Sequence, residues 1–247
     1  MTELRKVLLQ GAAVFGVTLD DTAADRFERY AALLREWNER VNLTAILDDE
    51  GIATRHFVDS LSLAPRLRGS LAVRPTNAPP LRLVDVGSGA GFPGLPLALA
   101  FPQLEVVLVD SLAKRVAFLD AVVADLKLDN VTTRHARAED AARLLDCRGT
   151  FDFAAARAVA SMPVLCEYCL PFLKVGGTFC AMKGRTDERD LPMDRALALL
   201  GGEPGPVDWF ALPGTDMQRT LVFVRKTRPT PPAYPRKAGK PEKEPLA

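Results

Sequence analysis

A glycine-rich segment carries the strongest chemical signal in the sequence. From Leu83 to Gly94 the chain reads LVDVGSGAGFPG, so an apolar strand pattern runs directly into a turn with four glycines. Glycine lets the backbone approach a ligand closely, because a Cβ would clash there. A turn of this kind between a strand and a helix is typical of nucleotide-binding crevices at the carboxyl ends of parallel strands. We therefore expect Gly87 and Gly89 to contact a nucleotide-containing cofactor.

The residues around this turn distinguish two classes of cofactor. The segment GAGFPG, from Gly89 to Gly94, matches the dinucleotide fingerprint G-x-G-x-x-G, which is a weak signal by itself. Asp85, at the strand end, would repel a pyrophosphate but suits the cationic sulfonium and amino group of S-adenosylmethionine. The sequence therefore favours S-adenosylmethionine. We expect Phe92 near the sulfonium, because an aromatic face attracts cations.

Three later strand ends carry polar residues that suit the same cofactor. Asp110 ends the second strand and can accept hydrogen bonds from ribose hydroxyls. Ala138 and Glu139 follow the third strand, where backbone groups and a carboxylate can meet the edge of an adenine. Arg157 ends the fourth strand, where it can bind either the cofactor carboxylate or RNA. These residues complete the predicted cofactor site.

The elements that position these residues alternate between strands and helices. Strands are expected at 81–86, 105–110, 131–137, 151–156 and 177–182, and helices at 93–100, 113–126, 140–145 and 162–172. Such βαβα alternation predicts an α/β fold with a doubly wound, mostly parallel sheet. Two further extended stretches, 207–212 and 219–225, flank a loop that contains Pro213 and Gly214 and predict an antiparallel hairpin at the sheet edge.

The pattern divides the chain into four parts. Residues 1–67 show helical spacing and predict an N-terminal helical extension, with Pro65 near the end of its third helix. Residues 68–80 contain Gly69, Pro75, Pro79 and Pro80 and predict a linker. Residues 81–227 form the α/β core, and residues 228–247 form a basic, proline-rich tail that we expect to be flexible.

Charge is distributed unevenly along the chain. The net charge is +1, but residues 225–244 carry seven basic and two acidic side chains, so this segment is +5 and the remainder is −4. A basic tail on an acidic body is either an arm for RNA phosphates or a solvated terminus. Both interpretations remain open at this point.

Composition excludes several other classes of protein. The apolar runs fall short of the roughly 20 residues of a membrane helix, and the N-terminal residues lack a signal-peptide pattern, so a cytoplasmic location is expected. Cys166 and Cys169 have the spacing of a zinc-ligand pair, but no second close pair accompanies them. We therefore expect no metal site, and we expect a monomer.

Several separated motifs resemble one known family. They are WNERVNLTAI from Trp37 to Ile46, HFVDSL from His56 to Leu61, DVGSGAGFPG from Asp85 to Gly94, DSLAKR from Asp110 to Arg115, Arg137-Ala138-Glu139, Arg157-Ala158, Lys183-Gly184 and YPRKAGKP from Tyr234 to Pro241. In this order they resemble the bacterial RsmG (glucose-inhibited division B) family across nearly the whole chain. Two departures are Ala156, where the family often has serine, and Ala238, where it often has proline.

The resemblance implies a fold, a reaction and a substrate. It implies a class I S-adenosylmethionine-dependent methyltransferase with a Rossmann-like sheet, cofactor contacts at Gly87, Phe92, Ala138, Glu139 and Arg157, and 16S ribosomal RNA of the small subunit as partner. The target implied by the resemblance is N7 of guanine 527. The N7 lone pair is free at neutral pH, so no general base is required, and we assign no catalytic residue. His56 and Lys183 are candidates for holding RNA.

Three alternatives stay open on the sequence alone. An S-adenosylmethionine-dependent methyltransferase could act on another RNA or on a small molecule. An NAD-dependent oxidoreductase would use the same glycine turn, although Asp85 argues against it. A non-enzymatic RNA-binding module on this fold should lose the glycine turn or Asp110, and this chain keeps both.

Overall fold

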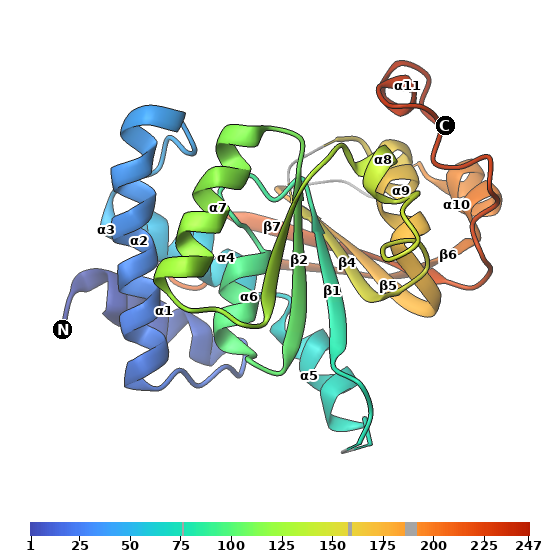
Figure 1. Ribbon diagram of the computed structural model, residues 1–247. Coiled ribbons are helices and arrows are strands. Elements are labelled where there is room, and N and C mark those ends of the chain that lie inside the picture. Colours follow the sequence, from blue (N-terminus) through green and yellow to red (C-terminus); the bar gives the residue numbers. More distant parts are fainter. Residues whose placement is uncertain (76, 158–159, 186–191) are drawn as a thin grey trace.

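A single twisted sheet organises the chain (Figure 1). The computed structural model describes residues 1–75, 77–157, 160–185 and 192–247. Within these residues seven strands lie in the order β3-β2-β1-β4-β5-β7-β6. β1 to β5 are parallel, whereas β7 runs antiparallel to both β5 and β6. The bounds are β1 Leu81–Val86, β2 Leu104–Asp110, β3 Val131–His135, β4 Phe151–Arg157, β5 Leu173–Lys183, β6 Gly202–Ala211 and β7 Gln218–Lys226.

The strand order reverses between β1 and β4, and this reversal positions the site. From β1 the chain proceeds outward to β2 and β3, then returns to pair β4 with the other side of β1. At such a point the loops after the two central strands diverge and leave a crevice at their carboxyl ends. The glycine turn after β1 and Arg157 at the end of β4 therefore lie on the same rim.

Helices cover both faces of the sheet (Figure 1). α6 (Gly94–Ala100) and α7 (Ala113–Asp125) cover one face, and α8 (Ala138–Ala141), α9 (Met162–Cys169) and α10 (Asp194–Leu200) cover the other. Alternate residues of β1 serve the two layers: Leu83 belongs to the first apolar core and Val84 to the second. This two-faced coverage explains why β1 and β4 are buried almost without interruption.

The N-terminal extension packs outside α6 and α7. Its long helix α2 (Asp21–Val41) begins where the Asp20 carboxylate accepts the Ala23 N–H at 2.7 Å, a normal N-cap. Phe27, Tyr30 and Leu34 of α2 are fully buried against the first core. The other elements of this part are α1 (Glu3–Val14), α3 (Asp49–Gly51), the π-helix η1 (Ile52–Val58), α4 (Asp59–Leu61) and α5 (Ala64–Ala72).

The boundaries differ from the sequence-based expectation at several points. Pro65 lies in the first turn of α5 rather than near the end of a helix, because a first-turn residue needs no N–H donor. Consequently α5 continues to Ala72, and the expected linker 68–80 is helical in its first part. α8 begins at Ala138 instead of 140, and α10 was not expected from the sequence. The expected edge hairpin is confirmed as β6 and β7.

The expectation of a flexible tail is wrong for the part of it that contacts the core. Beyond β7 the chain passes over α8 and α9 and forms the short helix α11 (Lys240–Lys243) (Figure 1). Pro235, Pro241 and Leu246 are buried, and the Arg236 guanidinium pairs with the fully buried Glu167. A basic, proline-rich composition suggested disorder, but these specific partners hold the tail in place.

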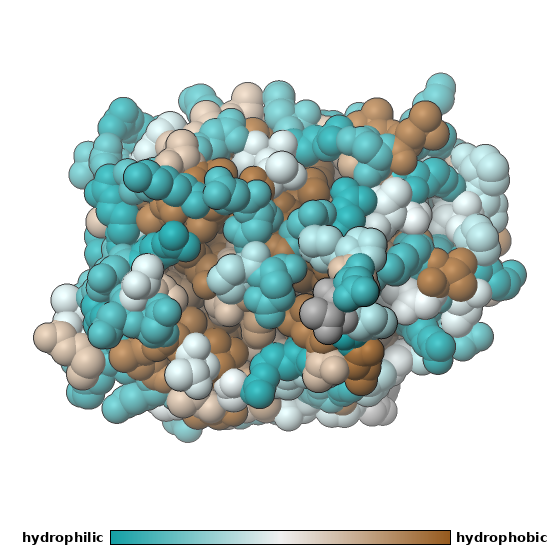
Figure 2. Space-filling view, turned by 60° about the horizontal axis from the view of Figure 1, so that its bottom comes forward, coloured by the Kyte–Doolittle hydropathy of each residue, from teal (hydrophilic) through white to brown (hydrophobic). Residues whose placement is uncertain are grey.

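The surface gives no sign of a membrane-spanning element among the described residues. None of their helices is long and apolar enough to cross a bilayer. Figure 2 shows one face, on which hydrophobic residues lie between hydrophilic ones. The large hydrophobic side chains that are exposed come from separate elements, among them Val14, Val73, Leu145, Val175 and Trp209.

Candidate functional site

The glycine turn is held by bonds within the protein. The N–H groups of Gly87 and Ser88 donate to the Val109 carbonyl at 2.8 and 3.1 Å, which ties the turn to the end of β2. Tyr30 of α2 donates its hydroxyl to the Ala90 carbonyl. Gly91 has φ +94°, and a Cβ there would lie 2.7 Å from the Tyr30 hydroxyl. Glycine is therefore required both for the backbone angle and for the contact with α2.

A cavity of about 420 Å³ opens beside this turn, at the carboxyl ends of β1 to β4. This volume lies in the range of small-molecule sites. The seven residues that the sequence assigned to the cofactor all line it: Gly87, Gly89, Phe92, Asp110, Ala138, Glu139 and Arg157. The structure thus brings together side chains from four successive strand ends. Ala158, part of one motif, lies outside the described residues.

Asp110 is buried at the edge of the cavity and organises the turn. Its Oδ2 accepts the Gly89 N–H and its Oδ1 accepts the Leu112 N–H, both at 2.9 Å. A carboxylate oxygen has two lone pairs, so each oxygen can accept one further hydrogen bond. The position therefore fits the expected acceptor for ribose hydroxyls, and the same carboxylate fixes Gly89.

Asp85 lies behind the turn instead of in the cavity. It is fully buried, and its Oδ2 accepts the Gly94 N–H at 2.9 Å, while its Oδ1 has no hydrogen-bond partner among the described residues. Burial raises the pKa of Asp85 to about 7, against the opposing effects of the Gly94 N–H and the Arg157 charge. The sequence suggested that an acid here is compatible with a nearby sulfonium, but the Asp85 side chain does not line the cavity. Its carboxyl holds α6 to β1.

Phe92 lies at the centre of a ring cluster that closes one side of the cavity. The His56 imidazole stacks on Phe92 with centroids 4.5 Å apart, and the Arg157 guanidinium carbon lies 4.8 Å from the same ring centroid. Phe92 is only 4% exposed, so little of its ring remains for a ligand. A cation–π contact between Phe92 and a sulfonium stays a prediction.

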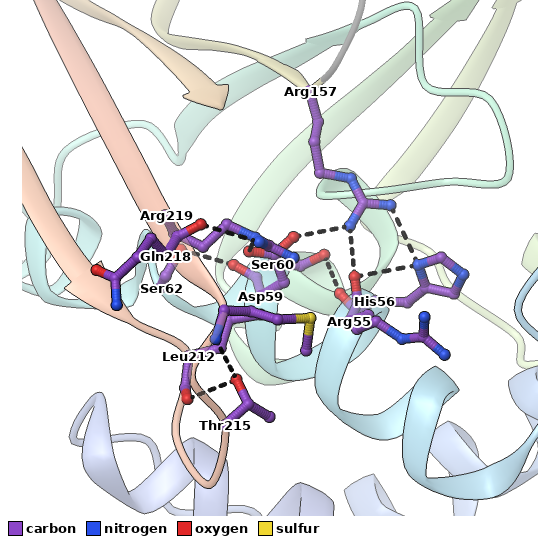
Figure 3. Close-up of polar contacts among 11 residues, drawn as sticks. Arg55, His56, Asp59, Ser60, Ser62, Arg157, Leu212, Thr215, Gln218 and Arg219 are labelled. Atoms are coloured by element: carbon purple, nitrogen blue, oxygen red, sulfur yellow. Dashed lines mark hydrogen bonds and ion pairs between the residues drawn. The ribbon is translucent and has the colours of Figure 1, made fainter. Parts of the chain in front are cut away.

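Asp59 joins the N-terminal extension to the site (Figure 3). Its Oδ2 lies 3.2 Å from Nη1 of Arg157, and its Oδ1 lies 3.0 Å from Nε of Arg219 on β7. Arg157 also donates to the Arg55 carbonyl at 3.1 Å. Burial lowers the pKa of Arg157, and the Asp59 and Asp85 carboxylates oppose this change. Two helical residues and two strand residues therefore form one polar network.

A second cavity of about 330 Å³ lies next to the first and shares His56 and Arg157 with it. The cations Arg55, Lys183 and Arg219 also line it. Lys183 donates to the Ala160 carbonyl at 3.2 Å, and burial lowers the pKa of its ammonium group. Burial, followed by the charge of Arg157, lowers the pKa of His56 to about 3, so its imidazole is neutral at pH 7.

Several residues of the site were not identified from the sequence. Ser111, Arg115, Tyr168 and Glu242 line the first cavity, and Asp59 lines the second. Asp59 belongs to the HFVDSL motif, and Glu242 directly follows the YPRKAGKP motif. The family motifs could therefore have pointed to both residues. Tyr168 lies in an ordinary helical pattern and gave no signal.

Among the described residues, no group of three or more His, Cys, Asp or Glu side chains is arranged to hold a metal ion. Cys166 and Cys169 are buried on α9, and burial raises the pKa of both thiols. Their spacing follows from one helix face packed in the core.

Comparison with known proteins gives a consistent family. The model of "GidB: rRNA small subunit methyltransferase G" matches residues 23–204. A ribosomal RNA small subunit methyltransferase G of Acetivibrio thermocellus is 49% identical over 99% of this chain and 97% of that protein. The protein of the same name from Geobacillus thermodenitrificans is 48% identical over 94% of both chains.

Solved structures support the fold alone, because their sequences are distant. The citrinin polyketide synthase CMeT domain superposes with a TM-score of 0.54 at 14% identity, covering 83% of this chain and 66% of that one. A geranyl diphosphate methyltransferase in complex with GPP and sinefungin gives 0.50 at 16% identity, covering 82% and 100%. The expected methyltransferase-like α/β fold is thereby confirmed.

Proposed function

Because the chain belongs to the rRNA small subunit methyltransferase G (GidB) family, we propose that it transfers a methyl group from S-adenosylmethionine to 16S ribosomal RNA. The target we propose is N7 of a guanine, guanine 527 by the family resemblance. The arrangement of two cavities in this structure supports the proposal. The seven residues assigned from sequence line one cavity, and a basic cavity adjoins it through His56 and Arg157.

The residues of the first cavity fit S-adenosylmethionine better than a dinucleotide. A pyrophosphate is normally bound by free backbone N–H groups of the glycine turn. Here the Gly89 N–H donates to Asp110, the Gly91 N–H donates to the Ser88 carbonyl, and the Gly87 N–H donates to Val109. These donors are used within the protein, and the carboxylate beside them would repel phosphate. Asp110, which lines the cavity, disfavours NAD more directly than Asp85, which lies behind the turn.

The expected contacts follow from the positions along the rim. Asp110 would accept bonds from the ribose hydroxyls, and Ala138 with Glu139 would meet the adenine. Arg157 borders both cavities and would bind either the cofactor carboxylate or an RNA phosphate, the two ligands that the sequence left open.

The second cavity would receive the target nucleotide. Arg55, Lys183 and Arg219 supply positive charge, which suits the phosphates that flank a base. His56 stands between the two cavities and is neutral, because burial depresses its pKa. A neutral imidazole does not repel a positive charge that develops on guanine as its N7 is alkylated.

Bound S-adenosylmethionine supplies an electrophilic methyl group on its sulfonium. The attacking N7 lone pair is free at neutral pH, so the protein needs neither a base nor a nucleophile. The contribution of the chain is alignment of two ligands in adjoining cavities, an effect that can reach about 7–11 kcal/mol. The Asp59 network fixes His56 and Arg157 between those cavities, and we assign no catalytic residue.

The proposal also covers the oligomeric state, the location and the RNA-facing surface of the protein. We propose that the protein works as a monomer in the cytoplasm, and that residues 1–67 act with the core 81–227 as the RNA-facing surface. The rival of a methyltransferase for a small molecule is disfavoured by the second cavity, whose lining includes three cations besides Arg157.

The decisive experiment is methyl transfer from labelled S-adenosylmethionine to small ribosomal subunits from cells that lack this gene. We expect label at guanine N7 of the 16S RNA, lost in Gly87→Trp, whose side chain would fill the cavity. Gly69→Trp is the matched control, because Gly69 is exposed on α5 with open space around it. Binding of S-adenosylhomocysteine without transfer would redirect the search to other RNAs or small molecules. Absence of cofactor binding would refute the proposal.

A further inference from the structure

The C-terminal strap, defined as residues 234–244, contacts residues that line the first cavity. It comes after β7, and its helix α11 contacts α9. Figure 1 shows this red end of the chain on the side of the sheet that α8, α9 and α10 cover. Arg148 donates to the Tyr234 carbonyl at 2.9 Å, and Arg143 donates to the Pro235 carbonyl. The path of the strap is therefore fixed by side chains of the core at its beginning.

The Arg236–Glu167 pair is the main anchor of the strap. Glu167 on α9 is fully buried, and its two oxygens accept from Nε of Arg236 at 2.9 and 3.1 Å and from Nη2 at 2.6 Å. The backbone N–H of Arg236 adds a bond of 2.7 Å to the same carboxylate. A buried carboxylate without its partner is costly, so this bidentate pair holds the strap firmly.

Beyond this anchor the strap reaches two side chains of the cavity. The Gly239 N–H donates to Oε1 of Glu139 at 2.8 Å, and the Tyr168 hydroxyl donates to Oε1 of Glu242 at 3.2 Å. Glu139, Tyr168 and Glu242 all line the first cavity. The strap thus adds Glu242 to the cavity lining and bonds directly to Glu139, a second lining residue.

We propose that the strap forms the adenosine-end wall of the S-adenosylmethionine site, and that Arg236 is a positioning residue that holds Glu139 through Gly239. This inference rests on the proposed function, because it concerns the same cofactor. Arg236 itself is not among the residues that line the first cavity, and it acts by seating the segment 236–239. Without it the Gly239 N–H would leave Glu139, and the wall that includes Glu242 would open.

The charges of the strap favour this role over an RNA arm. Arg236 is paired with Glu167, and Lys240 lies 3.5 Å from Glu244. The pKa of Arg236 is raised, chiefly by its hydrogen bonds to Glu167. Arg236 is thus used inside the protein, and Lys240 has an acidic neighbour within the strap. Residues 234–244 carry four basic and two acidic side chains, so the strap offers less positive charge to phosphates than the +5 of residues 225–244.

The test is equilibrium binding of S-adenosylhomocysteine by calorimetry, together with steady-state kinetics, for Arg236→Ala and Arg236→Lys in the full chain. We expect Arg236→Ala to weaken S-adenosylhomocysteine about tenfold and to raise the KM for S-adenosylmethionine by a similar factor. At saturating S-adenosylmethionine, kcat and the KM for ribosomal subunits should stay unchanged. Lys237→Ala is the matched control, since Lys237 is the exposed neighbour in the strap.

Arg236→Lys keeps a positive charge opposite Glu167 and loses the bidentate fork, so it decides the matter if Arg236→Ala does not fold. It should fold and show an intermediate loss of S-adenosylhomocysteine affinity. Unchanged affinity in the folded Arg236 variants would overturn the inference. A rise confined to the KM for subunits, with weaker salt dependence, would also overturn it in favour of an RNA arm. If wild-type protein failed to bind S-adenosylhomocysteine, the proposed function itself would fail.

Discussion

Asp59 and Arg157 form an ion pair that connects the N-terminal extension to the end of β4, with 3.2 Å between Oδ2 and Nη1. The Asp59 side chain is 7% exposed and also pairs with Arg219. Arg157 borders both cavities, so its orientation depends on a carboxylate from a different part of the fold. The helical extension is in this sense part of the site.

Replacing Asp59 should therefore be costly. Asp59→Ala leaves two partly buried guanidinium groups without their carboxylate, and we expect a loss of about 3 kcal/mol in the free energy of unfolding. Urea denaturation measures this. Asp208→Ala is the control, because the Asp208–Arg66 pair is exposed at 43% and 45% and should contribute less than about 1 kcal/mol. Equal losses in the two variants would show that the Asp59 network has no special role.

Asp110→Asn should weaken cofactor binding. The carboxylate accepts the Gly89 and Leu112 N–H groups and has lone pairs left for ribose hydroxyls. Losing a charged acceptor costs about 1.5–3 kcal/mol, so the Kd for S-adenosylhomocysteine should rise about tenfold or more. Calorimetry checks this against Asp216→Asn, a neutralisation of the same kind in the loop between β6 and β7. An unchanged Kd for Asp110→Asn would remove Asp110 from the site.

The cofactor cavity was predictable because its residues sit at strand ends. Parallel strands joined by right-handed helical crossovers bring their carboxyl ends to one edge, so positions such as Gly87, Asp110, Glu139 and Arg157 must converge there. The local strand pattern is sufficient to predict this convergence, because the position of each residue is set by the end of its own strand. The exact strand limits were not needed.

Contacts between distant segments were not predictable in the same way. Asp59 and Arg157 are 98 positions apart, and Glu167 and Arg236 are 69 apart. From its composition the tail resembled a basic arm. The sequence pattern does not show that Arg236 pairs with the buried carboxylate of Glu167, which comes from a distant helix. For Asp85 the sequence predicted the backbone position but not the direction of the side chain. The residue lies beside the glycine turn as expected, but its carboxyl accepts the Gly94 N–H behind the turn.

Lys226 provides a pH-dependent test of the packing around α10. Its ammonium is 1% exposed and donates to the Leu200 carbonyl and the Thr230 hydroxyl, and burial lowers its pKa from 10.5 to about 7. Between these two values the unfolded chain binds a proton that the folded chain does not, so this group makes stability rise with pH.

We therefore compare wild type with Lys226→Met at pH 7 and about pH 9. The wild type should gain about 2 kcal/mol of unfolding free energy relative to the variant over this interval, following about 1.4 kcal/mol per pH unit. Below the folded-state pKa the difference should level off. Urea denaturation at each pH gives the values, and Lys243→Met, which removes an exposed lysine, should show no such slope. A constant difference between wild type and Lys226→Met would mean that Lys226 stays charged when folded.

Gly94→Ala tests how closely α6 packs on β1. A Cβ at Gly94 would meet Cδ2 of Leu108 and would lie 2.9 Å from Oδ2 of Asp85, the atom that accepts the Gly94 N–H. We expect a loss of about 1–3 kcal/mol in unfolding free energy, because a well-packed core accommodates an added methyl poorly. S-adenosylhomocysteine affinity should fall with it, since displacement of α6 moves the glycine turn.

Gly69→Ala is the matched substitution in open space. Gly69 lies inside α5, where no atom approaches a Cβ within 4 Å. Alanine favours a helix over glycine by about 1 kcal/mol, so this variant should be more stable than wild type and bind S-adenosylhomocysteine equally well. Differential scanning calorimetry and binding measurements on both variants separate the two effects. If Gly94→Ala matched Gly69→Ala in stability, α6 would have room to move away from β1, and the packing that fixes the turn would be looser than these contacts indicate.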